Sequence, residues 1–283
     1  MQRVVYKIGD YSVKFDYALD NPYILESIEG LTAADIEVNS ARGYAQNGYT
    51  LQDVGYGTRH LNITFIIVGN SRADLYEKRA FLSQVFNPLL GVGELTYTND
   101  ANTRAIYCMP TITPTTVERM GLIETCNVEM TCFNPFWHDT QYKIAMLSGE
   151  SGGLTFPFKL PQVRFGANGG IATFDNVGDV AAPIRAVFTK TVNNPTITLK
   201  ETGDYITVDK TIAEGETLTV TTGYGEKNVI LTHTDGTTES AFHTINIGST
   251  FFELPRGTSH VDFTCADGNP TVVLYWRNYY VGV

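Results

Sequence analysis

The sequence has little of what a disulfide framework, a nucleic-acid binder or a membrane span requires. Four cysteines in 283 residues are too few to staple a chain of this length. The 20 lysines and arginines face 30 aspartates and glutamates, and the resulting net charge of -10 disfavours binding to DNA phosphates. No run approaches the roughly 18–20 apolar residues of a membrane helix, and the first ten residues lack a signal-peptide core. We therefore expect cytosolic synthesis and free, mostly buried thiols.

The common enzyme signatures are missing as well. The sequence contains no Gly-rich phosphate loop, no Gly-x-Ser-x-Gly turn and no His-Glu-x-x-His pair. Cys126, Cys132 and His138 come nearest to a metal site, but the gap between the cysteines is not a zinc-knuckle spacing. We expect no catalytic residue, no metal and no cofactor.

What is present is typical of an ordered, strand-rich protein. Hydrophobic residues make up 43% of the chain, with 16 Tyr, 15 Phe and 26 Gly. At this length a chain usually splits into two domains of about 140 residues each. The small residues of Ser148–Gly153 read as a linker. The boundary is therefore predicted near residue 145, which gives domains 1–145 and 146–283.

The first half alternates strand signals with one helix. Gly9-Asp10 predicts a hairpin turn between β-prone segments. Residues 61–69 and 121–132 alternate apolar and polar residues with the period of a strand. Ser71 and Asp74 have the spacing of a helix cap, and helical periodicity continues until Asn87-Pro88. The pattern predicts one helix at about 72–87.

A long polar stretch from Asn39 to Gly57 shows no sustained periodicity and is expected to be a loop. Loops of this length inside a domain are usually functional or disordered. Tyr44, Tyr49 and Tyr56 lie in the stretch, and tyrosine favours interfaces. They are the candidate subunit-interface residues, with a mobile loop as the alternative.

The second half reads as strand, turn, strand to the end, with no helical pattern. Short β-branched or aromatic segments are separated by Gly, Asp, Asn or Pro, which is typical of a sandwich or jelly roll. Tyr275 and Trp276 could offer rings for sugar stacking, but alternation places them on opposite faces, so at least one is expected in the core. Trp276 is the candidate sugar contact.

Several motifs in this order resemble the siphophage tail protein family. They extend over nearly the whole chain: Leu25-Glu-Ser-Ile-Glu-Gly-Leu31, the helix segment Asp74–Leu82, Cys132-Phe-Asn-Pro-Phe-Trp137, Asn176-Val-Gly-Asp179, Asn194-Pro-Thr-Ile197 and Phe252-Glu-Leu-Pro-Arg-Gly257. The family commonly shows Pro-Gly-x-Asn near the last of these, where this chain has Pro255-Arg-Gly257, so any contact made by that Asn does not carry over.

The resemblance implies a distal tail protein. Its fold would be mainly β, with an N-terminal β-rich domain containing one helix and a C-terminal galectin-like β-sandwich. Six copies would form a ring hub at the virion tail tip, assembled in the bacterial host cytoplasm. Its partners would be the tail tube protein, a tail-tip protein and receptor-binding or side-fibre proteins, with DNA only passing through the lumen and no membrane insertion.

Two other functions stay open on the residues alone. The second half could be a carbohydrate-binding module that contacts the host cell wall, and the whole chain could be a wall-degrading enzyme. An acidic balance suits a channel through which DNA slides, and the tyrosine-rich stretch suits contact with a neighbour. Both features favour the ring.

Overall fold

A computed structural model describes residues 2–18, 20–32, 34–116, 121–148, 169–268 and 271–283. The chain divides into two compact units, which we call the barrel unit (Met1–Thr140 with Tyr280–Val283) and the sandwich unit (Gln141–Tyr279). This corrects the predicted division in two ways. The boundary lies at 140 rather than 145, and the last four residues return to the first unit.

The barrel unit is built mainly from strands, with one helix, as the sequence predicted. Its elements are β1 (Arg3–Ile8), β2 (Tyr11–Asp16), β3 (Tyr23–Glu29), β4 (Ile36–Ala41), β5 (Thr50–Tyr56), β6 (Arg59–Val68), α1 (Arg72–Val85), the 3-10 turn η1 (Pro88–Leu90), β7 (Gly93–Thr98), β8 (Thr103–Thr116), β9 (Ile123–Cys132) and β10 (Trp137–Asp139).

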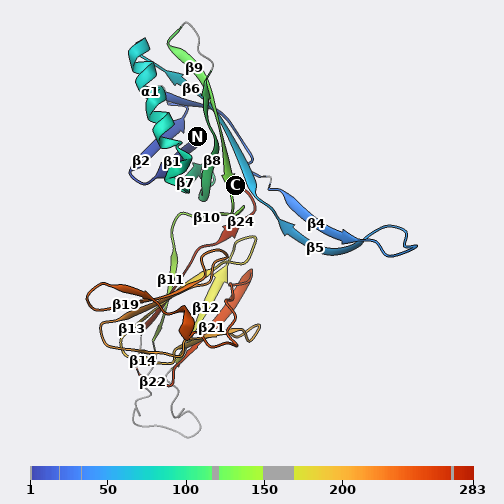
Figure 1. Cartoon of the computed structure of the whole chain (residues 1–283), viewed down its shortest axis with the longest axis vertical. Helices are drawn as coiled ribbons and strands as arrows, with labels where there is room; N and C mark the ends of the chain where they lie inside the picture. Colours follow the sequence, from blue (N-terminus) through green and yellow to red (C-terminus); the bar gives the residue numbers. More distant parts are fainter. Residues whose placement is uncertain (1, 19, 33, 117–120, 149–168, 269–270) are drawn as a thin grey trace. The chain divides into compact units, whose positions relative to one another are not determined.

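The main sheet of this unit closes on itself. Its strands run in the order β8-β7-β1-β2-β3-β6-β9, and β8 pairs with both β7 and β9 (Figure 1). The strands β10 and β24 (Tyr279–Tyr280) extend the sheet from β8. Buried and outward-facing residues alternate along most of these strands, with irregularities in β3 and β8, so about one side chain in two points into the interior.

The predicted hairpin and helix are confirmed. Ile8 pairs with Tyr11 across the Gly9-Asp10 turn, where Gly9 has a φ of 53° that favours glycine. Helix α1 begins after Ser71, whose hydroxyl accepts a hydrogen bond from the Asp74 backbone N–H at 3.2 Å. The helix ends at Val85, two residues before the predicted end.

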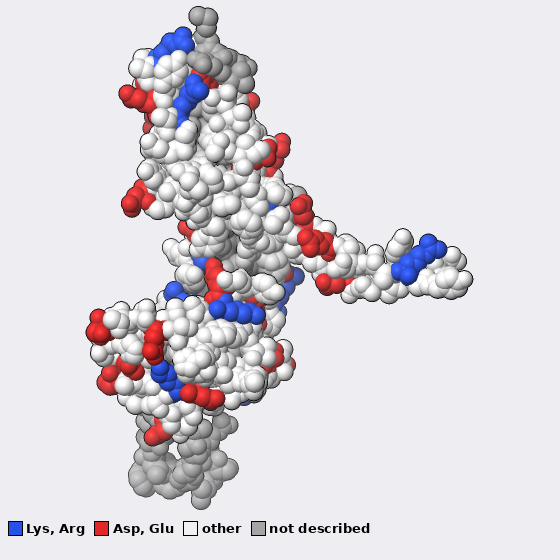
Figure 2. Space-filling model, viewed as in Figure 1, with Lys and Arg blue, Asp and Glu red and all other residues white. Residues whose placement is uncertain are grey.

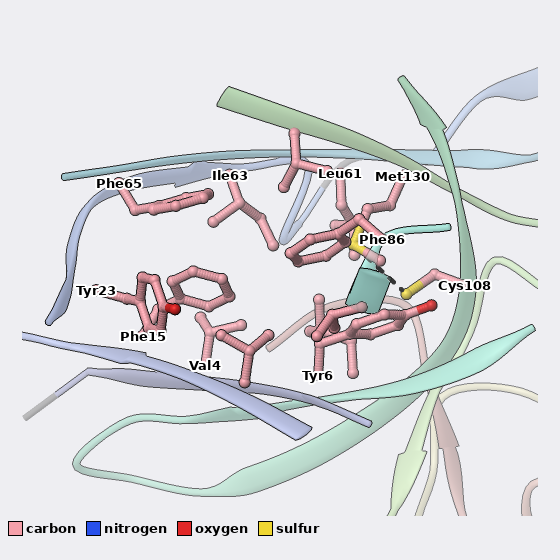
Figure 3. Close-up of a cluster of buried hydrophobic side chains, with 14 of the residues drawn as sticks. Val4, Tyr6, Phe15, Tyr23, Leu61, Ile63, Phe65, Phe86, Cys108 and Met130 are labelled. Atoms are coloured by element: carbon pink, nitrogen blue, oxygen red, sulfur yellow. Dashed lines mark hydrogen bonds between the residues drawn. The ribbon is translucent and has the colours of Figure 1, made fainter. Parts of the chain in front are cut away.

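The interior of the barrel is an aromatic and aliphatic core (Figure 3). Phe15 lies 4.5 Å from Phe65 between ring centroids, and Tyr6 stacks on Phe86 at 5.2 Å. Burial raises the pKa of the Tyr6 phenol. Cys108 and Met130 bring their sulfur atoms to 3.9 Å inside the same core. As the sequence predicted, Cys126 and Cys132 are buried too, and burial raises the pKa of Cys126 to about 12.

The end of the chain is held in the barrel unit by two arginines. Arg59 is fully buried, and its guanidinium donates to the carbonyls of Gly30, Pro135 and Val281 at 2.6, 2.7 and 2.5 Å. Burial lowers the pKa of Arg59. The guanidinium of Arg104 donates to the carbonyl of Gly282 and lies over a tyrosine ring of the same segment. The return of the last residues is therefore an integral part of the barrel unit.

The sandwich unit is all β apart from one 3-10 turn among its described residues. Its elements are β11 (Lys143–Ser148), β12 (Gly169–Asn176), β13 (Ile184–Thr189), β14 (Val192–Asn193), β15 (Thr196–Leu199), β16 (Tyr205–Thr207), β17 (Thr211–Ile212), β18 (Thr217–Thr221), β19 (Asn228–Thr232), β20 (Thr238–Ser240), η2 (Phe242–Thr244), β21 (Gly257–Thr264), β22 (Asp267–Gly268) and β23 (Thr271–Trp276).

Two sheets of this unit share one core. The larger runs β11-β23-β13-β18-β19-β20 and the smaller runs β12-β21-β15-β16. Phe188 from the larger sheet meets Phe263 from the smaller at 6.0 Å between ring centroids. A third sheet, β17-β14-β22, joins short segments. This is the sandwich that the evenly spaced short strands predicted.

Candidate assembly surfaces

The stretch predicted as a loop forms a two-stranded arm. β4 and β5 pair with each other and with no other described strand, and the hairpin projects from the rest of the barrel unit (Figure 1). The prediction of a loop without periodicity was therefore wrong for residues 39–41 and 50–56. Only residues 42–49 form the connection between the two strands.

One face of the arm is apolar and open to solvent. Ile36 pairs with Tyr56, and Val38 pairs with Val54, so these four side chains lie on the same side of the ribbon. A bulge between Asn39 and Ser40 carries the pattern on to Leu51. The side chains of Ile36 and Val38 are 62% and 59% exposed.

The other face of the arm is polar. Glu37 and Asn39 alternate with the apolar residues of β4, and Asp53 pairs with Asn39 across the ribbon. Figure 2 shows acidic atoms near the base of the arm and basic atoms near its free end. The ribbon is thus amphipathic, with the pattern of a half-buried strand pair but with neither face covered by described residues of its own unit.

The structure places the three candidate interface tyrosines along this arm. Tyr44 and Tyr49 lie in the connecting turn and are strongly exposed. Tyr56 lies at the base, where its ring meets Phe136 edge to face at 5.2 Å between centroids. The first two are therefore free to contact another molecule, and the third helps to fix the arm to the barrel unit.

The candidate sugar contact lies in the core of the sandwich unit. Trp276 is only 7% exposed, and its ring packs edge to face on Phe174 at 4.8 Å between centroids. Tyr275 is on the opposite side of β23, as alternation predicted, where it meets Tyr142 and the guanidinium of Arg185. Trp276 therefore presents no open ring face on which a sugar could stack.

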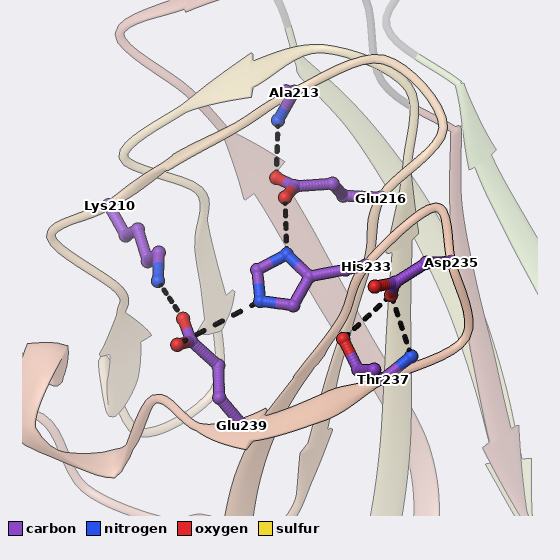
Figure 4. A network of polar contacts seen from close by, with 7 residues as sticks. All are labelled: Lys210, Ala213, Glu216, His233, Asp235, Thr237 and Glu239. Atoms are coloured by element: carbon purple, nitrogen blue, oxygen red, sulfur yellow. Dashed lines mark hydrogen bonds and ion pairs between the residues drawn. The ribbon is translucent and has the colours of Figure 1, made fainter.

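Polar clusters in the described residues do not have the form of a catalytic site. In the sandwich unit, Nδ1 of His233 donates to the carboxylate of Glu216 at 2.7 Å, and Nε2 lies 3.8 Å from Glu239, which pairs with Lys210 (Figure 4). The hydrogen bond to Glu216 raises the pKa of His233. The hydroxyl of Thr237, also drawn in Figure 4, donates to Asp235 at 2.6 Å and not to the imidazole. The network joins turns of the sandwich at its surface and pairs the imidazole with carboxylates, not with a hydroxyl or a thiol.

The described residues include a small pocket beside helix α1. A pocket of about 90 Å³ between α1 and the β8–β9 pair is lined by Arg79, Ser83 and Cys126, among others. Ligand sites for small molecules usually measure about 300–1,000 Å³. The described residues contain no cluster of three or more His, Cys, Asp or Glu side chains suited to a metal. None of their helices is long and apolar enough to cross a membrane.

Sequence reasoning missed Arg59 and the amphipathic arm. Nothing local marks Arg59 as buried, because its acceptors lie far away in the sequence. The arm did carry a signal, since Ile36 and Val38 alternate with polar residues and Val54 and Tyr56 do the same. The glycines and tyrosines between these short runs obscured it.

Comparisons with known proteins match each of the two units to a phage tail protein domain. A model described as a phage tail protein RIFT-related domain matches residues 13–132, and one described as the C-terminal domain of a siphovirus-type tail component matches residues 177–280. A search of curated proteins finds no match.

Solved structures match along the whole chain. The Dit protein (gp 19.1) of phage SPP1, described as a paradigm of the hub adsorption apparatus in phages that infect Gram-positive bacteria, matches with a TM-score of 0.68 and 12% identity over 98% of both chains. A chain of the activated phage P2 baseplate with Ca matches with a TM-score of 0.62 and 10% identity, again over 98% of both chains. These likenesses show a shared fold, and the two family models, which together match most of the chain, show that the chain belongs to the siphophage distal tail protein family.

Proposed function

We propose that this chain forms a ring of six copies at the distal end of the tail, where it joins the tail tube to the tip proteins. The observation that supports this most is the arm, an apolar ribbon with no cover from its own unit. The function is mechanical and needs no catalysis. The sandwich units would offer docking points for receptor-binding or side-fibre proteins.

The arm is not expected to hold its shape alone. An isolated two-stranded hairpin is at best marginally stable in water, and a contiguous apolar patch on the surface often marks a contact surface. Ile36, Val38 and Val54 would be covered when the arm lies against another molecule. Tyr44 and Tyr49 at its free end add two rings of a kind enriched in interfaces.

A second copy of the chain is the occupant that we propose for the arm. The barrel unit exposes another apolar segment after α1, where Leu89 is 91% exposed and Leu90 and Val92 are exposed too. A contact between two different surfaces of identical chains is heterologous, and it forms a closed ring when the rotation between copies closes. If the arm of each copy contacts the barrel unit of the next copy, the same contact repeats around the ring.

The proposed partners are the tail tube protein on one side of the ring and a tail-tip protein on the other. DNA would pass through the lumen without being held there, in keeping with a net charge of -10. The protein would be made and assembled in the host cytoplasm and end at the tail tip. No observation favours the carbohydrate-binding alternative, because Trp276 is buried.

Electron micrographs of the negatively stained protein test this proposal. The full-length chain should form rings of six copies, with a population that rises with concentration or on addition of the adjacent tail proteins. Single copies at every concentration, both alone and with those proteins, would contradict the ring.

A further inference from the structure

The larger sheet of the sandwich unit is apolar along the middle of its outward side. Its strands pair in register, so outward residues form rows that cross all six strands. Leu274, Ala186 and Val220 alternate with the middle row and are buried in the core. From β11 to β20, the middle row consists of Met146, Val273, Val187, Thr219, Ile230 and Ser240.

Two further rows flank the middle one. The row on one side is made of threonines, and the row on the other side contains the only charged residue described on this surface, an arginine. We call the three rows together the outer sheet face. The flanking rows are Thr271, Thr189, Thr217, Thr232, Thr238 and Ile144, Tyr275, Arg185, Thr221, Asn228.

The smaller sheet of the same unit has an outward side of a different kind. His260 and Asp262 point outward from β21, because Val261 between them is fully buried. Nδ1 of His260 donates to Glu201 at 2.8 Å, and the Lys200 ammonium lies 3.7 Å from Asp262. Charges on this side are thus paired within the unit, whereas the described residues of the outer sheet face include no carboxylate and no lysine.

The apolar residues of the outer sheet face are open to solvent. The side chains of Ile144 and Met146 are 57% and 72% exposed, and those of Val187, Val273 and Ile230 are partly exposed. A contiguous apolar patch often marks a contact surface. Its β-branched residues have few rotamers to lose, so covering them costs little side-chain entropy.

Arg185 stands at one end of this surface without a carboxylate. Its guanidinium lies 4.5 Å from the ring centroid of Tyr275 and 5.1 Å from that of Tyr142. Nε of Arg185 is buried and has no hydrogen-bond partner among the described residues. The guanidinium of Arg277 lies 4.2 Å from the same Tyr142 ring, which is 45% exposed. Two cations gathered around one exposed ring favour the approach of an anion.

We infer that the outer sheet face is a docking surface for a segment of another tail protein, one in which a carboxylate lies beside apolar side chains. This inference rests on the proposed function, which assigns docking to the sandwich units. The apolar side chains would cover the middle row, and the carboxylate would pair with Arg185, whose planar guanidinium suits bidentate pairing. The rings of Tyr142 and Tyr275 already restrict the arginine, so less entropy is lost when the pair forms.

The same face of a second copy is a poor occupant. A contact between two identical faces is isologous, so each Arg185 would meet only residues of the outer sheet face. The described part of that face offers no carboxylate, and both guanidinium groups would lose water without gaining a partner. Charge complementarity therefore favours a different protein that supplies an acidic residue.

The first test asks what touches position 185 in intact tails that contain the full-length chain. Arg185→Lys keeps the charge and supplies an amine, and a carbodiimide then joins that amine to a carboxylate with no spacer between them. Arg256→Lys makes the same change at an exposed site of the sandwich unit outside the outer sheet face. Mass spectrometry of the digested tails identifies both ends of each cross-link.

Position 185 should be joined to an aspartate or glutamate of a different tail protein, and position 256 should not be joined to that residue. A cross-link from position 185 to a carboxylate of this chain, in the same copy or in another, would overturn the inference. So would the absence of any cross-link from position 185 in tails whose other lysines have reacted.

The second test removes each half of the contact and measures how much of the cross-linked protein stays in the tails. Arg185→Glu sets two carboxylates against each other and should lower its amount per ring at least about ten-fold. Val187→Lys, in the middle row, should lower it as well. The matched controls are Arg256→Glu and Thr198→Lys, the latter on the outward side of the smaller sheet, and both should retain it. Full retention with Arg185→Glu, or equal loss in the controls, would overturn the inference.

Ring formation is counted in the same preparations, so that the two proposals fail in different ways. Rings that lack a cross-link from position 185 would leave the proposed function standing and overturn the docking surface. If the chain forms no rings, the proposed function fails, and the same cross-link is then sought in mixtures of the single chain with the other tail proteins.

Discussion

The interior of the barrel and the arm use the same kinds of residue in opposite surroundings. Phe15 and Phe65 alternate with polar residues on their strands and are fully buried. Ile36 and Val38 alternate in the same way on β4 and are more than half exposed. Alternation therefore marks an apolar face on a strand, and it does not say whether other residues of the same chain cover that face.

Charged groups show the same contrast between inside and outside. The Arg59 guanidinium is buried and holds backbone carbonyls from three distant segments. Lys210 and His233 lie at the surface of the sandwich unit and pair with carboxylates in contact with water. Loss of a buried hydrogen-bond partner lowers the free energy of unfolding strongly. Exposed ion pairs contribute little to it, because solvent screens their charges.

The largest effect is expected for Arg59→Ala. The change removes three hydrogen bonds from a charged donor, to the carbonyls of Gly30, Pro135 and Val281, and each bond of this kind contributes about 1.5–3 kcal/mol, so we expect a loss of about 5 kcal/mol or more. Urea unfolding is followed by the fluorescence of Trp137, in a Trp276→Phe background that silences the sandwich unit. Arg59→Lys should lose less, since it keeps the charge. If Arg59→Ala unfolds at the same urea concentration as the parent, the hydrogen bonds of Arg59 do not stabilise the barrel unit.

A large effect is also expected for Phe15→Ala in the barrel core. Removal of a buried phenylalanine typically costs about 3–5 kcal/mol, from lost burial and the cavity that remains. The matched control is Tyr11→Ala, at the exposed start of the same strand, which should cost far less. The same fluorescence titration compares the two. Similar losses for both would mean that the interior is not the main source of stability.

A smaller, pH-dependent effect is expected for the network around His233. The partners Glu216 and Glu239 raise the pKa of the imidazole, while their own pKa values are lowered. The contribution of the protonated imidazole to the free energy of unfolding is fully present below its ordinary pKa of 6.5, and it is lost as pH rises through the raised pKa. The contribution of the ionised carboxylates to the free energy of unfolding is fully present above pH 4.5, the ordinary pKa of glutamate, and it is lost as pH falls through their lowered pKa values.

The network therefore stabilises the sandwich unit most between pH 4.5 and 6.5. Melting temperatures of the parent and of His233→Asn, measured from pH 4 to 9, should differ most in that window and converge at higher pH. Lys210, Asp235 and His243 also face this group, and Lys210→Met serves as a control that leaves the imidazole in place. A constant difference at all pH values would assign the effect to packing rather than to charge.

The smallest effect on stability is expected on the arm. Val38→Asp places a charge on the exposed apolar face, and surface substitutions of this kind usually change stability by less than about 0.5 kcal/mol. Asn39→Asp adds the same charge on the opposite face. At a protein concentration at which all three chains are single copies, both variants should have the melting temperature of the parent in circular dichroism, because assembly would otherwise stabilise the parent. A marked loss for Val38→Asp alone would show that its side chain packs within its own chain.

Local patterns predicted much of the fold, and long-range contacts account for what they left out. The Ser71 cap predicted the start of α1, and the alternation in β6 and β9 predicted which side chains enter the core. The return of the last residues depends on Arg59 and Arg104, whose acceptors lie more than 170 positions away, so no window of sequence contains it. The same limit applies to the arm, because none of the described residues covers its apolar face and the cover that we propose is a second copy of the chain.

The account depends most directly on whether the apolar face of the arm holds copies together, and native mass spectrometry of the full-length chain measures this. The parent and Asn39→Asp should give particles of six copies of the 31.2 kDa chain, and Val38→Asp should give mainly single copies. If Val38→Asp assembles as fully as Asn39→Asp, the arm is not the contact between subunits and the account is wrong at its centre.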